Sequence, residues 1–332
     1  MKLFRLSTYR LFRPSVFGYH KKMSDPFKVM VMSDLHFSYQ VTDQKLDAIV
    51  RQVKNLAPKY ILMPGDLVDT LDMVDADSEL NRFLNFLKSL GELATVIISV
   101  GNHDMYRKPK GGRHGWQYGE TNQLFDQIRQ LQNVHLLDNQ VYEDQYIYCL
   151  GYTQSPAYYK AKKSVTENLP QMLKELQSLP ENYLYHLPVK KIKFALIHSP
   201  VFLNDSEVKY QLREFDYFIS GHMHNGVVPP VFDELINNSR GLISPTKKFA
   251  PDNSRNTLRT YADKLLVVGA LTTFHESIKP FNKMNAFFPS YMALMEFTAK
   301  KTYARKPYIR HTYKNWQSYE KSIFIFRDPY GY

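Results

Sequence analysis

The sequence contains a single cysteine, Cys149, so no disulfide can form within the chain. This excludes a disulfide-stapled scaffold and is typical of a protein from a reducing compartment. No stretch approaches the roughly 20 apolar residues that a membrane-spanning helix needs. Internal repeats, low-complexity tracts and long linkers are also missing. With 44% hydrophobic residues among 332, the chain is therefore expected to fold as a packed globular protein.

The formal net charge of +11 lies almost entirely at the two ends of the sequence. Residues 1–24 carry +6 and residues 300–321 carry +6, whereas residues 25–299 carry −1. A nucleic-acid enzyme more often carries its basic residues around its cleft. The distribution disfavours nucleic acid as a partner, although the alternation of cations and aromatic residues near the C-terminus could stack on bases.

We interpret residues 1–24 as a basic N-terminal extension of one domain that covers residues 25–332. Residues 1–22 mix apolar residues with cations, and their apolar run is too short for a secretory signal. Two alternatives stay open: a peripheral contact with an anionic membrane surface, or a frayed tail with translation starting at Met23. We therefore predict a cytoplasmic protein, with the inner membrane surface as the alternative.

Five short apolar runs are each followed by Gly, Asp, Asn or His, which is typical of buried strands that end in turns. Amphipathic helical patterns separate the first three runs, and alternating strands and helices predict an α/β domain. The five runs are FKVMVMSDLH (27–36), KYILMPGDLVD (59–69), ATVIISVGNHD (94–104), KIKFALIHSP (191–200) and FDYFISGHMH (215–224). The helices are expected over 43–57, 78–91 and 121–132.

The second half of the sequence has a different pattern of predicted elements. Several strand-like runs follow one another without helices between them, which predicts a second, more antiparallel sheet. Prolines punctuate a predicted helical insertion at about 156–188. Basic strands are expected at about 290–332.

The polar residues that follow the five runs should meet, because ligands of open α/β sheets bind beyond the carboxyl ends of the strands. Carboxylates and imidazoles without a thiolate are the ligands of a hydrolytic transition-metal site and not of a zinc finger. Residues i and i+2 at a strand end can point to the same side, which suits Asp-x-His and His-x-His. The residues concerned are Asp34, His36, Asp66, Asn102, His103, Asp104, His198, His222 and His224.

The motifs D-x-H, G-D-x-x-D, G-N-H-D, H-x-P and G-H-x-H occur in this order between residues 27 and 224. Together they resemble the calcineurin-like metallophosphoesterase family. The resemblance implies a four-layer αββα sandwich, in which two mixed β-sheets are flanked by helices and two metal ions lie at the carboxyl ends of the strands. It also implies that Asp66 bridges the two ions. One ion would be held by Asp34, His36, Asp66 and His224, and the other by Asp66, Asn102, His198 and His222.

By the same resemblance, we expect hydrolysis of a phosphate mono- or diester by a metal-bridging hydroxide, without a covalent intermediate. The ions would be Mn, Fe, Zn or Co, and the substrate a phosphorylated small molecule or a lipid-linked phosphate. His103 would contact the phosphoryl oxygen or protonate the leaving group, and Asp104 would either orient His103 or cap the next turn. The alternatives are a metal-dependent nuclease and a non-catalytic scaffold on the same fold.

The stretch that follows the G-N-H-D motif is rich in cations and contains two adjacent glycines. It is expected to form a loop beside the cleft. Four residues of this loop are candidates for binding the anionic substrate: Arg107, Lys108, Arg113 and His114.

Overall fold

The computed structural model describes most of the chain. The described residues are 3–12, 26–107, 117–119, 122–159, 168–200, 205–229, 232, 241–243, 254, 257–258, 265–274, 281–286, 288–298 and 319–327.

Two mixed sheets form the centre of the molecule. The larger sheet has the strand order β15-β1-β14-β2-β3-β4-β7, and β2, β3, β4 and β7 are parallel to one another. Its strands are β1 (Leu3–Phe12), β2 (Phe27–Val31), β3 (Tyr60–Met63), β4 (Thr95–Ser99), β7 (Val134–Leu137), β14 (Ser290–Thr298) and β15 (Tyr319–Arg327).

The smaller sheet has the order β12-β13-β11-β10-β9-β8, with parallel pairs at its centre and antiparallel pairs at both edges. Its strands are β8 (Gln140–Glu143), β9 (Ile147–Tyr152), β10 (Ile192–Ile197), β11 (Tyr217–Ser220), β12 (Thr257–Leu258) and β13 (Leu265–Val267). Short β5 (Tyr106–Arg107) and β6 (Gln117–Tyr118) pair separately.

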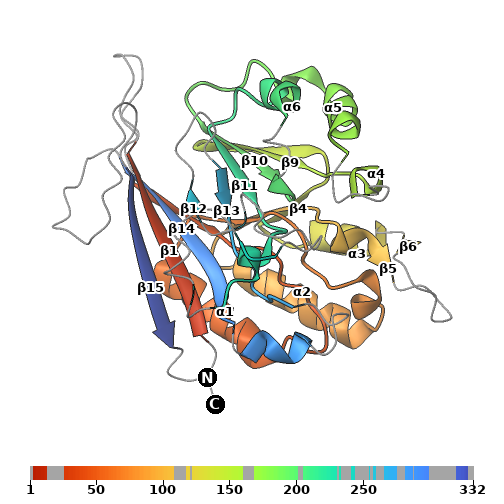
Figure 1. The fold of residues 1–332 in the computed structure, drawn as a ribbon, viewed down its shortest axis with the longest axis vertical. Helices are drawn as coiled ribbons and strands as arrows, with labels where there is room; N and C mark the ends of the chain where they lie inside the picture. The colour runs from red at the N-terminus through yellow and green to blue at the C-terminus, as the bar shows by residue number, and fades with distance from the viewer. Residues whose placement is uncertain are drawn as a thin grey trace.

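Helices cover the outer face of each sheet (Figure 1). The first group comprises α1 (Asp43–Leu56), α2 (Asp77–Gly91) and α3 (Asn122–Arg129), and the second comprises α4 (Pro156–Tyr159), α5 (Leu169–Gln177) and α6 (Ser206–Gln211). The short turns are η1 (Leu71–Val74), η2 (His103–Met105), η3 (Glu181–Tyr183), η5 (His224–Val227) and η7 (Phe281–Ala286). In the part of the chain that the structure describes, none of the helices has both the length and the apolar character to cross a bilayer.

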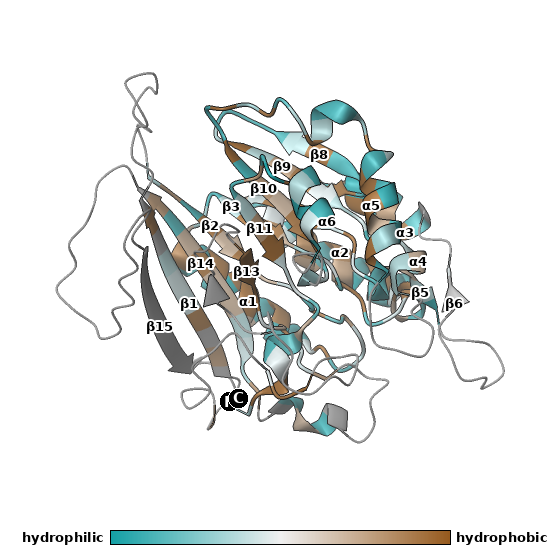
Figure 2. Ribbon diagram, turned by 45° about the horizontal axis from the view of Figure 1, so that its top comes forward, coloured by the Kyte–Doolittle hydropathy of each residue, from teal (hydrophilic) through white to brown (hydrophobic). Residues whose placement is uncertain are grey.

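Three separate hydrophobic clusters show that the fold has four layers. One lies between α1–α3 and the large sheet, one between the two sheets, and one between the small sheet and α4–α6. The alternation of side chains along a strand explains the division. In β2, Met30 joins the first cluster and Val31 the second; in β10, Phe194 joins the second and Ala195 the third. Hydrophobic residues accordingly gather on inner strands such as β11 and β13 (Figure 2). The predicted αββα sandwich of two mixed sheets is confirmed.

The N-terminal segment differs from the expected extension. Leu3–Phe12 forms β1, which is parallel to β14 and antiparallel to β15 within the large sheet. Phe4 and Leu6 are buried in the first cluster, and Tyr9 and Leu11 in the cluster between the sheets. These four residues of the segment thus belong to the core.

The segment expected as a helical insertion contains α4, α5 and η3, and it connects β9 to β10. These two strands are parallel, so the chain has to cross over between them, and a helical connection supplies the crossover. The helices of this segment are therefore a layer of the sandwich itself.

Candidate metal centre

The candidate ligands all lie just beyond the carboxyl ends of neighbouring strands in the two sheets. Asp34 and His36 follow β2, Asp66 follows β3 and Asn102 follows β4. From the small sheet, His198 follows β10 directly, while His222 and His224 follow β11. These seven side chains are buried.

The backbone curls sharply where these residues sit. Asp34, His36, Asp66, His222 and His224 have φ between 45° and 67°, in the left-handed region that residues other than glycine seldom adopt. Such backbone conformations persist only where the surrounding structure enforces them, and they gather at functional sites. Five of the seven candidate ligands share this feature.

Side chains from the two sheets form two adjoining groups that have Asp66 in common. Asp34, His36, Asp66 and His224 present ligand atoms within 4.8 Å of one another, as do Asp66, His198 and His222. The same oxygen of Asp66, Oδ2, lies 3.7 Å from His36 Nε2 and 3.0 Å from His198 Nε2. One carboxylate oxygen therefore faces an imidazole from each group.

Backbone carbonyls orient two of the imidazoles. His198 Nδ1 donates to the Pro64 carbonyl at 2.6 Å, and His224 Nδ1 donates to the Thr273 carbonyl at 2.5 Å. A carbonyl can only accept, so each Nδ1 carries the hydrogen and each Nε2 is the ring nitrogen that can bind a metal. His36 Nε2 and His224 Nε2 lie 3.2 Å apart, so both point at the same region.

Asn102 supplies an independent test of whether the residues suit a metal. Its Oδ1 is buried and has no hydrogen-bond partner among the described residues. Leaving a buried polar atom unpaired costs about 1–3 kcal/mol, which a bound cation would offset. Carboxylate, imidazole and amide donors are a ligand set that divalent transition metals accept. The buried groups thus fit a binuclear divalent metal site.

Glycines let the strand ends approach one another closely. A Cβ atom on Gly101 would collide with the backbone nitrogen and Oδ1 of Asp66, and one on Gly221 would collide with Ser33 and Asp34 Oδ2. The two turns that carry Asn102 and His222 can therefore pack directly against the carboxylates only because both positions lack a side chain.

Charge pairing sets the protonation of the metal-free cluster. Burial alone would raise the pKa of Asp66, but the facing imidazoles of His198, His103 and His36 hold it well below its usual range. Burial would lower the pKa of His198, yet the Asp66 carboxylate raises it to about 9. For His222, burial and the nearby His198 charge lower the pKa to about 3.

These shifts predict that the combined contribution of His198 and His222 to the stability of the metal-free protein is largest near pH 6.5. The stabilisation from protonated His198 is complete below its unfolded pKa of about 6.5 and is lost as the pH rises through about 9. The contribution from neutral His222 is present above pH 6.5 and is lost as the pH falls toward 3. Thermal unfolding of chelator-treated protein between pH 5 and 9 would measure both contributions. A melting temperature that rises steadily up to pH 9 would contradict the contribution from His198.

His103 lies beside His36, and a backbone carbonyl orients its ring. Its Nδ1 donates to the backbone carbonyl of Asp69 at 2.6 Å. Its ring packs edge-to-face with the ring of His36, and the two ring centroids are 4.6 Å apart. A contact with a substrate would therefore use Nε2. Asp69 itself is buried, with Oδ1 3.8 Å from His36 Nδ1 and 3.9 Å from His103 Nδ1.

The Asp104 side chain binds backbone groups of two turns. The Asp104 carboxylate accepts from the backbone N–H groups of Leu67 and Val68 through Oδ1 and of Gly101 through Oδ2. Adjacent side chains diverge, so Asp104 points into the protein while His103 faces the cluster. Burial and the Asp66 charge raise the pKa of Asp104 to about 7, although the backbone donors oppose the shift. Asp104 thus ties the turn after β3 to the turn after β4.

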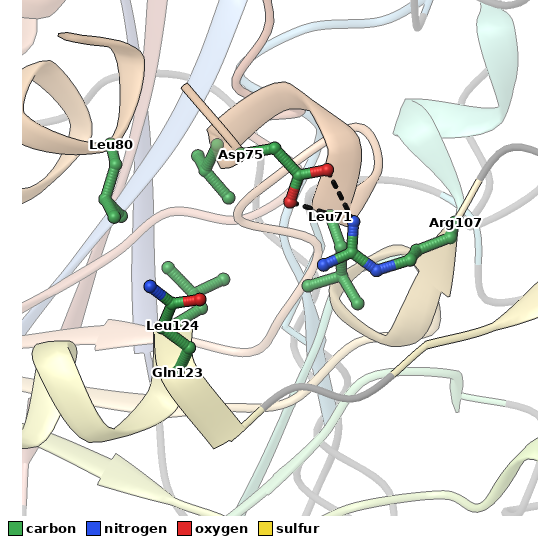
Figure 3. Close-up of a pocket in the computed structure, with 7 residues that line it drawn as sticks. Leu71, Asp75, Leu80, Arg107, Gln123 and Leu124 are labelled. Carbon is green, nitrogen blue, oxygen red and sulfur yellow. Dashed lines mark hydrogen bonds and ion pairs between the residues drawn. The ribbon is translucent and has the colours of Figure 1, made fainter. Parts of the chain in front are cut away.

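Arg107, expected to bind the substrate anion, is paired with acids of the neighbouring turn. Its guanidinium donates to both carboxylate oxygens of Asp75, at 2.7 and 2.8 Å (Figure 3). It also lies 3.6 Å from Asp72. The pair helps to line a pocket of about 300 Å³, and the other lining residues are Leu71, Val74, Leu80, Leu124 and Gln123. The other candidates of this loop, Lys108, Arg113 and His114, lie outside the described residues.

Several backbone groups that contribute to the centre were not anticipated from the sequence. Pro64 and Thr273 act through backbone carbonyls, which carry no signal in the residue type. The backbone carbonyls of Ser33 and Asp34 bind the segment that follows β13. The Thr272 N–H, for example, donates to the Asp34 carbonyl at 3.0 Å. The G-D-x-x-D motif did mark Asp69, whose carbonyl holds His103.

The model of the calcineurin-like phosphoesterase family matches residues 27–226, which span all seven candidate ligands and most of the sandwich. The chain belongs to the calcineurin-like phosphoesterase family. The matched residues thus include both ligand groups at the strand ends.

Two curated relatives match only in part. An uncharacterized metallophosphoesterase of Campylobacter jejuni is 23% identical over 225 residues, which cover 65% of this chain and 48% of the relative. Phosphodiesterase YaeI of Escherichia coli is 31% identical over 105 residues, covering 31% of this chain and 36% of that protein. The chain thus spans about half the length, or less, of the curated relatives it matches.

Two solved structures are distant neighbours of the chain. A dimetal phosphatase from Danio rerio is 13% identical, with a TM-score of 0.41 and coverage of 81% of this chain and 92% of that one. A purple acid phosphatase from yellow lupin seeds is 12% identical, with a TM-score of 0.35 and coverage of 62% of this chain and 39% of that one.

Proposed function

We propose that this protein is a metal-dependent phosphoesterase that hydrolyses a phosphate mono- or diester. The observation that carries the proposal is the position of Asp66 Oδ2 between an imidazole of each ligand group. That arrangement is what two cations bridged by one carboxylate require, and paired divalent metals about 3.5–4 Å apart are typical of phosphatases and nucleases.

We assign the first metal to Asp34, His36, Asp66 and His224, and the second to Asp66, Asn102, His198 and His222. When bound, such a pair acts as a Lewis acid and makes water a nucleophile at neutral pH. Only Asp34 and Asp66 among these ligands carry negative charge, so the ligands leave the loaded centre with a positive excess. An anionic phosphate ester would be drawn to such a centre.

His103 is proposed to act on the substrate and not on the metals. With Nδ1 held by the Asp69 carbonyl, its Nε2 would donate a hydrogen bond to a phosphoryl oxygen or a proton to the leaving oxygen. Asp104 would keep the two turns that carry Asp66 and Asn102 in register through its three backbone hydrogen bonds. The substrate is proposed to be a phosphorylated small molecule or a lipid-linked phosphate.

The test is a panel of bis(4-nitrophenyl) phosphate and 4-nitrophenyl phosphate, assayed with Mn, Fe, Zn or Co added back to chelator-treated protein. We expect about two metal ions per chain by elemental analysis, and hydrolysis of at least one ester that depends on added metal. The diester is the first choice, because one relative carries the name phosphodiesterase. Protein that binds two ions yet hydrolyses neither ester would favour a scaffold, and protein that binds none would refute the proposal.

A further inference from the structure

Lys45 is a buried lysine in an unusual place. It lies in the first turn of α1, only 8% exposed, although the positive end of the helix dipole disfavours a cation there. Lysine is among the residues least often buried. Strong contacts with its ammonium group must therefore offset both costs.

The ammonium group bonds a segment that is remote in the sequence. Lys45 Nζ donates to the Leu271 carbonyl at 2.6 Å and to Thr272 Oγ1 at 2.6 Å. Ser290 Oγ donates to the same carbonyl at 2.8 Å. Hydrogen bonds from a charged donor are roughly twice as strong as neutral ones, so Lys45 fixes this segment firmly to α1.

The segment that Lys45 holds is part of the metal centre. It runs parallel to the chain that carries Asp34, with the Leu271 N–H donating to the Ser33 carbonyl at 2.9 Å and the Thr272 N–H to the Asp34 carbonyl at 3.0 Å. The next carbonyl, that of Thr273, accepts from His224 Nδ1. Both Asp34 and His224 belong to one ligand group, and neither belongs to the group with His198 and His222.

We propose that Lys45 is a positioning residue for one of the two metals, because it anchors the segment that orients His224 and abuts Asp34. This inference rests on the proposed two-metal function. It predicts a selective effect: loss of the ammonium should weaken the ion held by Asp34, His36 and His224 and spare the ion held by His198 and His222. A lysine that only satisfies a buried carbonyl would not distinguish the two ions.

The first variant is Lys45→Met, which keeps a side chain of similar length but removes the ammonium donors. The second is Thr272→Val, which removes only the hydroxyl acceptor. Lys54→Met, an exposed position on the same helix, is the matched control. Loss of groups that orient ligands typically costs 10–100-fold in metal affinity. We therefore expect Lys45→Met to weaken one of two cobalt equivalents by roughly 10–100-fold and Thr272→Val by less, with Lys54→Met unchanged.

Calorimetric and visible-absorption titrations with Co²⁺ would measure the two equivalents separately. Amide hydrogen exchange of metal-free protein is expected to quicken at 271–273 in Lys45→Met, which is a readout independent of any metal. Because the two residues share one contact, their combined effect should be smaller than the product of the single effects.

Equal weakening of both equivalents, or no weakening of either in Lys45→Met and Thr272→Val, would overturn the positioning role while leaving the two-metal proposal intact. If Lys45→Met does not fold, Thr272→Val decides between these outcomes. Wild-type protein that fails to bind two Co²⁺ ions would instead overturn the proposed function, and this inference with it.

Discussion

Asp66→Asn is expected to abolish tight binding of both metals and to remove nearly all turnover. Asparagine keeps an oxygen that can accept from the backbone N–H of His103, as Asp66 Oδ1 does at 2.8 Å. The atom at Oδ2 becomes an amide nitrogen, which has no lone pair to offer a cation. Since that oxygen faces both groups, we expect losses above the roughly 100-fold that mark the loss of an orienting partner. Elemental analysis and the ester assay would measure them.

Asp72→Asn is the matched control, because Asp72 lies on the neighbouring turn and pairs with Arg107 outside the ligand groups. It should retain both ions. Asp66→Asn should also bring the pKa of His198 down, because Asp66 is what raises it. Retention of two tightly bound ions by Asp66→Asn would contradict the bridging role.

His103→Gln is expected to keep both metals and to lose activity in proportion to the basicity of the leaving group. General acid catalysis typically contributes about 10²–10⁴-fold, so an alkyl ester should slow by that order. An activated 4-nitrophenyl ester needs little protonation of its leaving oxygen and should slow far less. The comparison of the two rates is the measurement.

His135→Gln serves as the control, because His135 lies on β7 and contacts Tyr142, away from the ligand groups. It should leave both rates unchanged. Equal losses on the two esters for His103→Gln would indicate that His103 binds the phosphoryl group and does not donate a proton.

The convergence of the ligands could be predicted because it follows from local rules. Parallel strands end at one edge of a sheet, so polar residues after β2, β3 and β4 had to meet. The helices α1 and α2 begin and end within a residue of the expected ranges, because their apolar spacing is regular. In α1, the Thr42 side chain also caps the first turn. What those rules do not contain is the contact between two sheets, which brings His198 and His222 against Asp66.

The N-terminal strand was not predicted, because its pairing is nonlocal and its basic residues suggested a surface tail. Short alternations such as Phe4-Arg5-Leu6 and Tyr9-Arg10-Leu11 were the available signal for a strand. The apolar phase shifts by one residue between Leu6 and Tyr9, which hides the two-residue period. Similarly, Asp104 was open to two interpretations, because a carboxylate next to a histidine looks like its partner until the backbone donors around it are known.

The position of β1 has a consequence for the order in which the fold can close. Its two hydrogen-bonding neighbours, β14 and β15, are the last two strands that the structure describes. During synthesis, β1 therefore remains with both edges unpaired until β14 and β15 have been made. Unpaired strand edges can pair incorrectly with other strands. A chaperone that shields β1 would therefore be most useful before β14 and β15 have been made.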